Sequence, residues 1–392
     1  MWANWAVIGT NSGRAKREVK AGDVATMRAA LTLARRGLGR VWPNPAVGCV
    51  LVREDLGAEG RARVVGRGWT QPGGRPHAET EALRRAGTLA RFATAYVTLE
   101  PCNHQGETSP CTEALIAAGV ERCVVAIEDP DPRVAGTGLA RLNAAGIAVT
   151  QGVCSEEARE VNAGFLMRVT KGRPLFTLKT ATTLDGRVAT AKGESKWITG
   201  EGARAFAHGL RADHDAVMIG IGTALADAPE LTCRLPGLED RSPLRIVLDS
   251  RLLLPPDSPL ASTAKRLPVW LYAGGGADRA KRQALEAKGV TVIDAETGGD
   301  GRPDLGWVAK DLGRRGLTRV LVESGGRLAA TLLKRDLIDR IAWFRAPKLI
   351  GGDGLGAVAA FGISGLAEAP AFALDSIAAV GADVLETYRR AP

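Results

Sequence analysis

Residue types that bind zinc follow one another in the N-terminal part of the chain. His77 opens a His-Ala-Glu triplet, and Cys102 and Cys111 each follow a proline. One imidazole and two thiolates make three protein ligands, which leaves the fourth position of a tetrahedral zinc open for water, as in a catalytic site. Glu79 is a nearby carboxylate that the metal does not need as a ligand. The pattern predicts a catalytic zinc site in which Glu79 carries protons.

The local sequence predicts how these side chains come together. Residues two apart on a regular helix lie about 200° apart, so His77 and Glu79 converge only where a helix begins. The stretch from Pro76 to Gly87 has acidic residues first and arginines late, as expected of a helix with that start and end. Cys111 opens a second such helix, whose N-terminus would favour the thiolate. The whole arrangement is typical of zinc-dependent base deaminases.

Two other interpretations of these residues stay open. His104 could supply a fourth protein ligand, and the zinc would then be structural. The cysteines could instead form a cluster of buried thiols in a reduced protein. The ordered set, with each member at the end of its own helix or strand, favours the catalytic interpretation.

Composition and length indicate a protein of two or three α/β domains, because 45% of the 392 residues are apolar and only 5% aromatic. The six cysteines have no disulfide spacing, which favours a reducing cytoplasm. No apolar run approaches the roughly 18 residues of a membrane helix. Residues 1–21 are expected to be a disordered leader, since their order of apolar and basic residues does not fit a signal peptide.

The net charge of +9 arises from 52 Lys and Arg residues against 43 Asp and Glu residues. These charges are dispersed, and no basic run with aromatic residues resembles a groove for a nucleic-acid strand. A small anionic substrate, such as a phosphorylated one, explains dispersed positive charge equally well. Charge alone does not decide between the two.

Short apolar runs alternate with helical stretches in two series, separated by an interruption at residues 171–174. We therefore predict a first domain at 22–170 and a second at 173–392, each with a parallel or mixed sheet covered by helices on both faces. The second series has predicted strands near 176–179, 216–219, 245–248, 269–272, 290–293, 319–322 and 341–344. Its predicted helices lie at 201–210, 277–287, 307–314 and 327–333.

Glycine and polar clusters mark the second series. Gly325 and Gly326 follow a predicted strand and precede a helix, where backbone N–H groups can approach a phosphate. A plain tight turn explains this pair equally well, and a flexible loop explains the glycines at 351–354. Polar runs at 179–187 and 193–199 are more specific.

Motifs in both halves occur in a fixed order, namely Asn44-Pro45-Ala46-Val47-Gly48-Cys49-Val50, His77-Ala78-Glu79, the run from Pro101 through Gly106, Glu107 and Thr108 to Cys111, and then 182–187 and 193–199. From about Asp23 to the C-terminus they resemble one family, the bifunctional deaminase–reductases of riboflavin biosynthesis. Eight residues separate Cys102 from Cys111, whereas the general deaminase signature has two. The longer spacing is the one this family has.

The resemblance implies a cytidine-deaminase-like three-layer α/β/α domain followed by a dihydrofolate-reductase-like α/β domain. It implies hydrolytic deamination of 2,5-diamino-6-(5-phosphoribosylamino)pyrimidin-4(3H)-one. NADPH would then reduce the ribosyl group of 5-amino-6-(5-phosphoribosylamino)uracil to ribityl. The implied cofactors are Zn²⁺ and NADPH. The implied protein is a cytoplasmic homodimer with a phosphorylated pyrimidine as its small-molecule partner, and no nucleic-acid or membrane partner is expected.

The resemblance also implies roles for individual residues. His77, Cys102 and Cys111 match the metal ligands, Glu79 the proton carrier, and Asn44 and His104 contacts of the first substrate. Contacts of the second substrate match Ser195, Arg211, Leu231, Arg234 and Glu323. Cofactor contacts match Ala181, Trp197, Thr223, Asp227, Ser250, Gly325, Gly326, Arg327, Leu328, Ala329, Ala330 and Thr331.

Physical chemistry supports some of these roles. Arg211 and Arg234 suit a phosphate, because a guanidinium can bind it bidentately. Asp227 and Glu323 are each expected at a strand-to-helix junction that lines the cleft. Arg251 is a candidate contact of the NADPH 2′-phosphate, although an exposed arginine without such a role would look the same in the sequence.

Two rival functions remain possible at this level. A transfer-RNA or nucleoside deaminase with an accessory domain would bind RNA with strong salt dependence. A structural zinc module fused to a nucleotide-sensing domain would hold metal without turnover. Neither rival explains the motifs of both halves.

Overall fold

The computed structural model describes residues 19–20, 22–56, 62–105, 109–131 and 134–391. The expected leader at 1–21 therefore lies outside the described residues except for Val19 and Lys20, and so do Gly106, Glu107 and Thr108. The chain divides into two compact units: residues 1–34, 47–69 and 77–159 form the first, and 35–46, 70–76 and 160–392 the second. Within the described residues no helix is long and apolar enough to cross a membrane.

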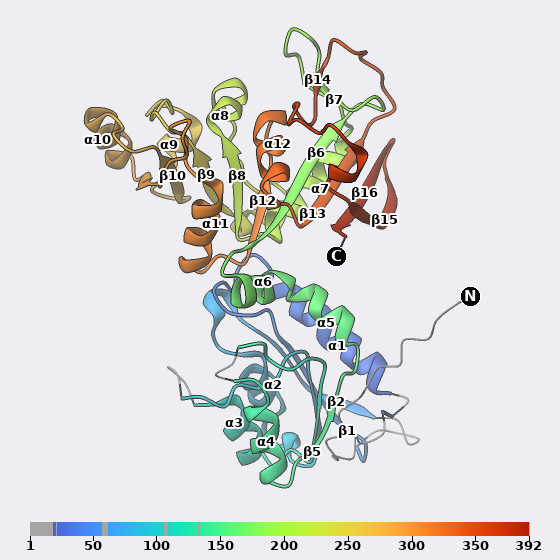
Figure 1. Ribbon diagram of the computed structural model, residues 1–392. Helices are drawn as coiled ribbons and strands as arrows, with labels where there is room; N and C mark the ends of the chain where they lie inside the picture. Colours follow the sequence, from blue (N-terminus) through green and yellow to red (C-terminus); the bar gives the residue numbers. More distant parts are fainter. Residues whose placement is uncertain (1–18, 21, 57–61, 106–108, 132–133, 392) are drawn as a thin grey trace. The chain divides into compact units, whose positions relative to one another are not determined.

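The first unit is a mixed sheet between layers of helices (Figure 1). Its strand order is β2-β1-β3-β4-β5, in which β1 pairs antiparallel with β2 and β3, and β3, β4 and β5 run parallel. The strands are β1 (Gly48–Arg53), β2 (Arg63–Trp69), β3 (Thr94–Val97), β4 (Arg122–Val125) and β5 (Ala148–Gln151). The helices are α1 (Asp23–Ala34), α2 (Ala78–Ala86), α3 (Cys111–Ala117) and α4 (Thr137–Ala144), and α5 (Ser155–Val161) spans the division between the units.

Glycines in the first sheet let helices approach it closely. A Cβ at Gly48 would lie 1.9 Å from the Ala30 carbonyl oxygen of α1, and one at Gly68 would lie 2.1 Å from the Ala78 carbonyl oxygen of α2. Because α2 carries a predicted zinc ligand at its start, its contact with β2 fixes where that ligand lies.

The second unit contains a long sheet with strand order β11-β10-β9-β8-β12-β6-β13-β16-β15 (Figure 1). Its strands are β6 (Leu175–Thr182), β8 (Ala216–Gly220), β9 (Leu244–Leu248), β10 (Val269–Ala273), β11 (Thr291–Asp294), β12 (Arg319–Val322), β13 (Arg340–Arg345), β15 (Phe372–Val380) and β16 (Asp383–Arg390). A separate small sheet pairs β7 (Arg187–Ala189) with β14 (Leu355–Gly356).

Helices cover both faces of this sheet. Buried residues of α8 (Ile221–Asp227), α9 (Pro259–Ser262) and α10 (Arg279–Ala287) form one hydrophobic cluster with the strands. Those of α11 (Leu305–Arg314) and α12 (Gly326–Lys334) form another. The unit also contains α6 (Ala163–Lys171) and α7 (Glu201–Ala212).

Most predicted strands and helices are present, and the predicted break at 171–174 lies between the end of α6 and the start of β6. The strands β7, β14, β15 and β16 and the helices α5, α6, α8 and α9 were not predicted. The sequence of β15, FALDSIAAV, does not alternate apolar and polar residues, because neither face of this mostly exposed strand is buried. It therefore lacks the pattern that indicates a strand in a sequence. Residues 35–46, 70–76 and 160–170, predicted within the first domain, cluster with the second unit.

Candidate active sites

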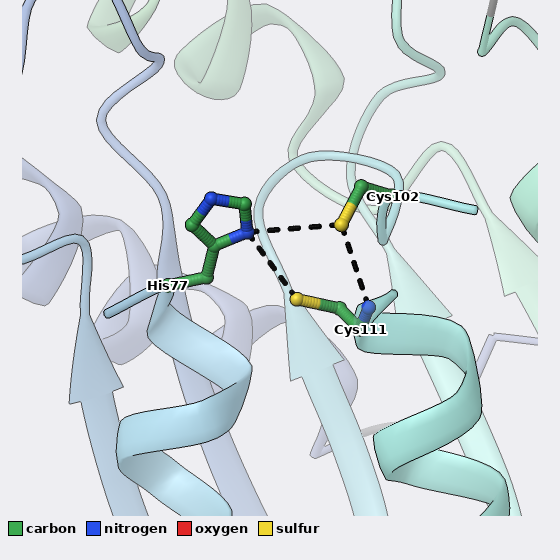
Figure 2. A group of neighbouring side chains, drawn as sticks. All are labelled: His77, Cys102 and Cys111. Carbon is green, nitrogen blue, oxygen red and sulfur yellow. Dashed lines mark hydrogen bonds between the residues drawn. The ribbon is translucent and has the colours of Figure 1, made fainter. Parts of the chain in front are cut away.

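His77, Cys102 and Cys111 converge in the first unit, as Figure 2 shows. The Nδ1 atom of His77 lies 3.7 Å from the Cys102 Sγ atom and 3.4 Å from the Cys111 Sγ atom. A tetrahedral zinc with ordinary Zn–N and Zn–S bond lengths would hold such atoms about 3.6 Å apart. The three side chains therefore fit a zinc ion.

Two helix starts supply His77 and Cys111, as predicted, whereas a loop supplies Cys102, which was expected at the end of a strand. His77 is the N-cap of α2, Cys111 is the first residue of α3, and Cys102 lies in the loop after β3. The backbone N–H of Cys111 donates to the Cys102 Sγ atom at 3.4 Å. Hydrogen bonding from Cys111 lowers the pKa of the Cys102 thiol, and the same interaction raises the pKa of Cys111. In the absence of metal, Cys102 thus becomes a thiolate first.

Glu79 lies in the first turn of α2 and is only 3% exposed. Burial raises the pKa of its carboxyl, and the charge on His77 partly opposes this effect. The carboxyl also interacts with both cysteines. A carboxyl with a raised pKa beside the ligand atoms can accept and return a proton near neutral pH.

The other two residues expected at this site have different surroundings. His104 is exposed and is not among the described residues whose ligand atoms converge. Asn44 clusters with the second unit, where its backbone N–H donates to the Val41 carbonyl oxygen at 2.9 Å. Gly74 has a φ of +86°, and a Cβ there would lie 1.8 Å from the Asn44 side-chain nitrogen. Only glycine therefore leaves room for that amide.

In the second unit Arg211 and Glu323 form a bidentate ion pair. The Arg211 Nε and Nη2 atoms donate to the carboxylate at 2.6 and 3.0 Å, and the Lys179 ammonium lies 4.0 Å away. Burial by itself would raise the pKa of the Glu323 carboxyl, but Arg211 and Lys179 outweigh it and lower the pKa to about 2. Glu323 is therefore ionised, and it occupies the bidentate edge of Arg211 that was expected to bind phosphate.

A backbone carbonyl joins this pair to the neighbouring loop. The Thr232 carbonyl oxygen accepts from the Arg211 Nη1 atom at 2.9 Å and lies 3.0 Å from the His208 Nδ1 atom. Leu231 is buried next to it with a φ of +59°, and Arg234 is exposed. The structure thus brings Arg211, Glu323 and the loop of Leu231 and Arg234 together.

Two of the expected cofactor residues meet where the strand order reverses. The Gly325 N–H donates to the Thr223 hydroxyl at 3.4 Å. Thr223 follows β8 and Gly325 follows β12, and these neighbouring parallel strands lead to opposite sides of the sheet. Open α/β sheets bind ligands at such a switch point.

The remaining expected cofactor residues are more scattered. Asp227 ends α8, so its predicted place at a strand-to-helix junction is wrong: α8 begins directly after β8, and the junction is at Gly220. Glu323 does lie at such a junction. Ala329 and Ala330 are buried, whereas Arg327 and Thr331 are exposed. Ala181, Ser195, Ser250 and Leu328 are half-buried.

Trp197 is 64% exposed, with the Arg204 guanidinium 4.7 Å from its ring centroid. The Lys348 ammonium donates to its carbonyl oxygen at 2.8 Å. The loop that follows β13 makes a further contact, since the Gly351 N–H donates to the Asp185 carboxylate at 2.7 Å. Together these contacts fasten the segment of Ser195 and Trp197 to the loop after β13.

The sequence interpretation did not assign roles to Lys179 or His208. Lys179 carries the only ionisable side chain of β6. A lysine inside an otherwise uncharged strand indicates a functional role, such as contact with a charged group. His208 lies three residues before Arg211 on α7, a spacing that puts both on one face of the helix. Either pattern could have been found without the structure.

Comparison with known proteins covers both units. Residues 21–127 match the model of the cytidine and deoxycytidylate deaminase zinc-binding region, and residues 174–385 match that of the RibD C-terminal domain. The riboflavin biosynthesis protein RibD of Escherichia coli is 41% identical, over 92% of this chain and 98% of its own.

Solved structures agree with this result. Acinetobacter baumannii RibD superposes with a TM-score of 0.83 at 36% identity, covering 94% of this chain and 99% of its own. The diaminohydroxyphosphoribosylaminopyrimidine deaminase/5-amino-6-(5-phosphoribosylamino)uracil reductase of Thermotoga maritima gives a TM-score of 0.81 at 32% identity with the same coverage.

Proposed function

Because the chain belongs to the RibD family of bifunctional riboflavin biosynthesis enzymes, we propose which of its residues perform each of the two reactions. The first unit has a cytidine-deaminase-like fold, and the second is a reductase domain with a dihydrofolate-reductase-like sheet. The function is deamination followed by reduction. A transfer-RNA deaminase is not favoured, because the relatives match both halves.

The observation that carries the first assignment is the convergence of His77, Cys102 and Cys111 beside the buried Glu79. Bound zinc would supply a Lewis acid that lowers the pKa of water in the open position. Glu79 would take the first proton of the attacking water and deliver it to the ring nitrogen, and it would then carry the hydroxyl proton to the departing ammonia. The substrate we propose is 2,5-diamino-6-(5-phosphoribosylamino)pyrimidin-4(3H)-one, and Asn44 and His104 would contact it.

For the second reaction we propose a site around Arg211, Glu323 and the turn at Gly325. NADPH would supply the hydride that reduces the ribosyl carbon of the deaminated product. The uncapped start of α12 suits a cofactor phosphate, since the N-cap Gly325 has no side chain to satisfy the first N–H groups. Arg211, which still has N–H groups beyond those bound to Glu323, and the exposed Arg234 would bind the substrate phosphate. Ser195 and Leu231 would complete the substrate contacts.

The direct test supplies the diamino compound together with NADPH to the purified full chain. Release of ammonia and loss of NADPH absorbance should both be observed, and the second should require the first. Ammonia release without any NADPH oxidation would refute the reductase half of the proposal.

Breaking the Arg211–Glu323 pair should impair the reductase and destabilise the second unit. Removing one partner of a buried ion pair costs about 3–5 kcal/mol, because the other charge stays buried without compensation. We expect Arg211→Met to lose up to this amount in a denaturant titration, since the Lys179 ammonium 4.0 Å from Glu323 still compensates part of its charge, and to lose reduction. The pKa of Glu323 should rise from about 2, because Arg211 no longer opposes its burial.

A double variant separates stability from activity. Arg211→Met/Glu323→Leu should recover part of the lost stability, since the buried carboxylate is gone and only the Lys179 ammonium loses a charged neighbour, yet it should stay inactive as a reductase. Deamination by the same protein serves as the internal control. Recovery of reduction in the double variant would show that the pair is structural only.

Arg251 should determine the preference for NADPH over NADH. It is exposed and follows Ser250 directly after β9. A hydrogen bond to a charged group contributes about 1.5 kcal/mol or more, so Arg251→Ala should raise the KM for NADPH about tenfold. The KM for NADH should stay unchanged. Arg335→Ala, an exposed arginine at the far end of α12, is the control; an equal rise with NADH would reject the assignment.

We propose that residues 22–170 and 173–392 are the deaminase and reductase domains. The fragment 173–392 should fold, bind NADPH and reduce the deaminated compound while leaving the diamino compound untouched. A fragment from residue 160 should be more stable, since the Arg319 Nη2 atom donates to the Glu160 and Val161 carbonyl oxygens at 2.9 Å. A folded fragment whose fluorescence does not respond to NADPH would contradict this division.

We also propose a cytoplasmic homodimer without a nucleic-acid partner. The edge strand β15 pairs only with β16 and is exposed along most of its length, with Leu374 and Ile377 55% and 61% exposed. An apolar edge of this kind suits association of this chain with a second copy of itself. The cytoplasmic location is proposed on a separate ground: both cysteine ligands must stay reduced to bind zinc, which a reducing compartment ensures. Sedimentation of the full chain as a monomer at micromolar concentration would oppose the dimer.

A further inference from the structure

Glu100 is a buried carboxylate that accepts hydrogen bonds from four backbone N–H groups. It is 4% exposed and lies two residues before Cys102. One oxygen accepts from the Gly138 and Leu139 N–H groups at 2.8 and 3.3 Å. The other accepts from the Asp129 and Gly136 N–H groups at 3.1 and 3.0 Å. A single side chain thus satisfies four amides.

Most of these amides belong to the start of α4. The N-cap of that helix, Gly136, has no side chain to cap it, so Glu100 takes this role from a distant point of the chain. The helix also lies very close to the ligand segment: a Cβ at Gly138 would lie 2.2 Å from the Pro101 carbonyl oxygen. The Asn103 side chain donates to the Thr137 carbonyl oxygen at 3.4 Å. The backbone on both sides of Cys102 is therefore anchored to α4.

The opposite side of Cys102 is held by α3. The Cys102 carbonyl oxygen accepts from the Thr112 N–H at 3.2 Å, and the Cys102 Sγ atom accepts from the Cys111 N–H at 3.4 Å. Glu113 of α3 and Arg141 of α4 also form an ion pair at 2.7 and 2.9 Å, but their side chains are 43% and 39% exposed, so this surface pair adds little to holding Cys102. Cys102 thus lies between two helix starts, and Glu100 supplies the hydrogen bonds of one of them.

We propose that Glu100 is a positioning residue of the metal centre: it uses the start of α4 to hold Cys102 at bonding distance from a metal shared with His77 and Cys111. Glu100 touches neither metal nor substrate. Its loss would leave four amides without their acceptor and release the backbone of one ligand. Outer-shell partners of metal ligands typically contribute 10–100-fold to metal affinity. The proposal rests on the zinc site proposed above.

The test measures the zinc dissociation constant of the folded full chain by competition with a chromogenic chelator, well below the unfolding temperature. Glu100→Ala should weaken zinc binding 10–100-fold. Glu100→Gln should be intermediate, because its amide oxygen still accepts from one pair of N–H groups while its NH₂ group cannot accept from the other. Glu113→Gln is the matched control on the same helix pair and should leave zinc affinity unchanged.

Two further measurements separate positioning from a merely structural role. The absorption bands of the cobalt-substituted protein should shift in Glu100→Ala and not in Glu113→Gln. The free energy of unfolding of the metal-free proteins measures how much Glu100 stabilises the fold by capping α4, without any effect of the metal. If metal-free Glu100→Ala is less stable but binds zinc with parental affinity, Glu100 only caps α4 and the proposal is wrong. If the parent chain itself binds no zinc, the proposed function fails instead. Far-UV circular dichroism and a cooperative unfolding transition verify that each full-length variant is folded.

Discussion

Glu79→Gln is expected to slow deamination by about 10²–10⁴-fold while zinc stays bound, which is the usual contribution of a general acid–base residue. The amide preserves the shape of the buried side chain in the first turn of α2 but cannot accept the proton of the attacking water. Metal analysis measures whether zinc stays bound, and the rate of ammonia release measures the loss of deamination. Reduction of the deaminated compound should continue at the parental rate.

The same helix offers a matched control. Glu81 is also a buried glutamate of α2, but its carboxylate pairs with Arg84 and Arg85 at 3.1 and 3.2 Å. Glu81→Gln should leave the deamination rate near that of the parent. Loss of zinc from Glu79→Gln would make Glu79 a ligand and remove it from the role of proton carrier.

Replacing a ligand should have a comparably large effect. Cys102→Ala leaves two protein ligands where three had converged, so we expect about one zinc per parent chain and little in the variant. Deamination should be lost with the metal, and reduction should remain. Metal analysis after dialysis against a weak chelator, together with both activity assays, measures this outcome.

Cys154→Ala is the control for this prediction. Cys154 is half-buried, and its Sγ atom donates only to the Val24 carbonyl oxygen at 3.8 Å. Its replacement should not alter zinc content. Full zinc occupancy with normal deamination in Cys102→Ala would show that the ligand set is assigned wrongly.

The zinc cluster could be predicted from the sequence because each ligand lies beside a local signal. Gly87 ends α2 and Gly119 follows α3, each with a positive φ, and acidic residues open both helices. Such capping signals act over a few residues and need no tertiary context.

The rest depended on contacts between distant residues. Nothing near Arg211 in the sequence indicates that its bidentate edge is bound to Glu323, which is 112 residues away. Likewise, the four amides that bind Glu100 are 29 to 39 residues from it. α8 follows β8 without a loop, and the start of the helix at Gly220 was not identified, so Asp227 at the end of α8 was misplaced. Pairings of this kind are decided by tertiary packing and not by local sequence.

Because the cysteines differ in burial, they should differ in their reactivity toward an alkylating reagent, and this difference can report whether zinc is bound. Cys49 and Cys123 are fully buried near Glu79, and burial raises the pKa of both thiols, so they stay protonated and unreactive at neutral pH. Burial also raises the pKa of the half-buried Cys154. In the metal-free protein Cys102 has the lowered pKa that iodoacetamide selects. Zinc would shield it, so the fraction of the Cys102 peptide that is alkylated, found by mass spectrometry, should fall as zinc is added to the metal-free protein.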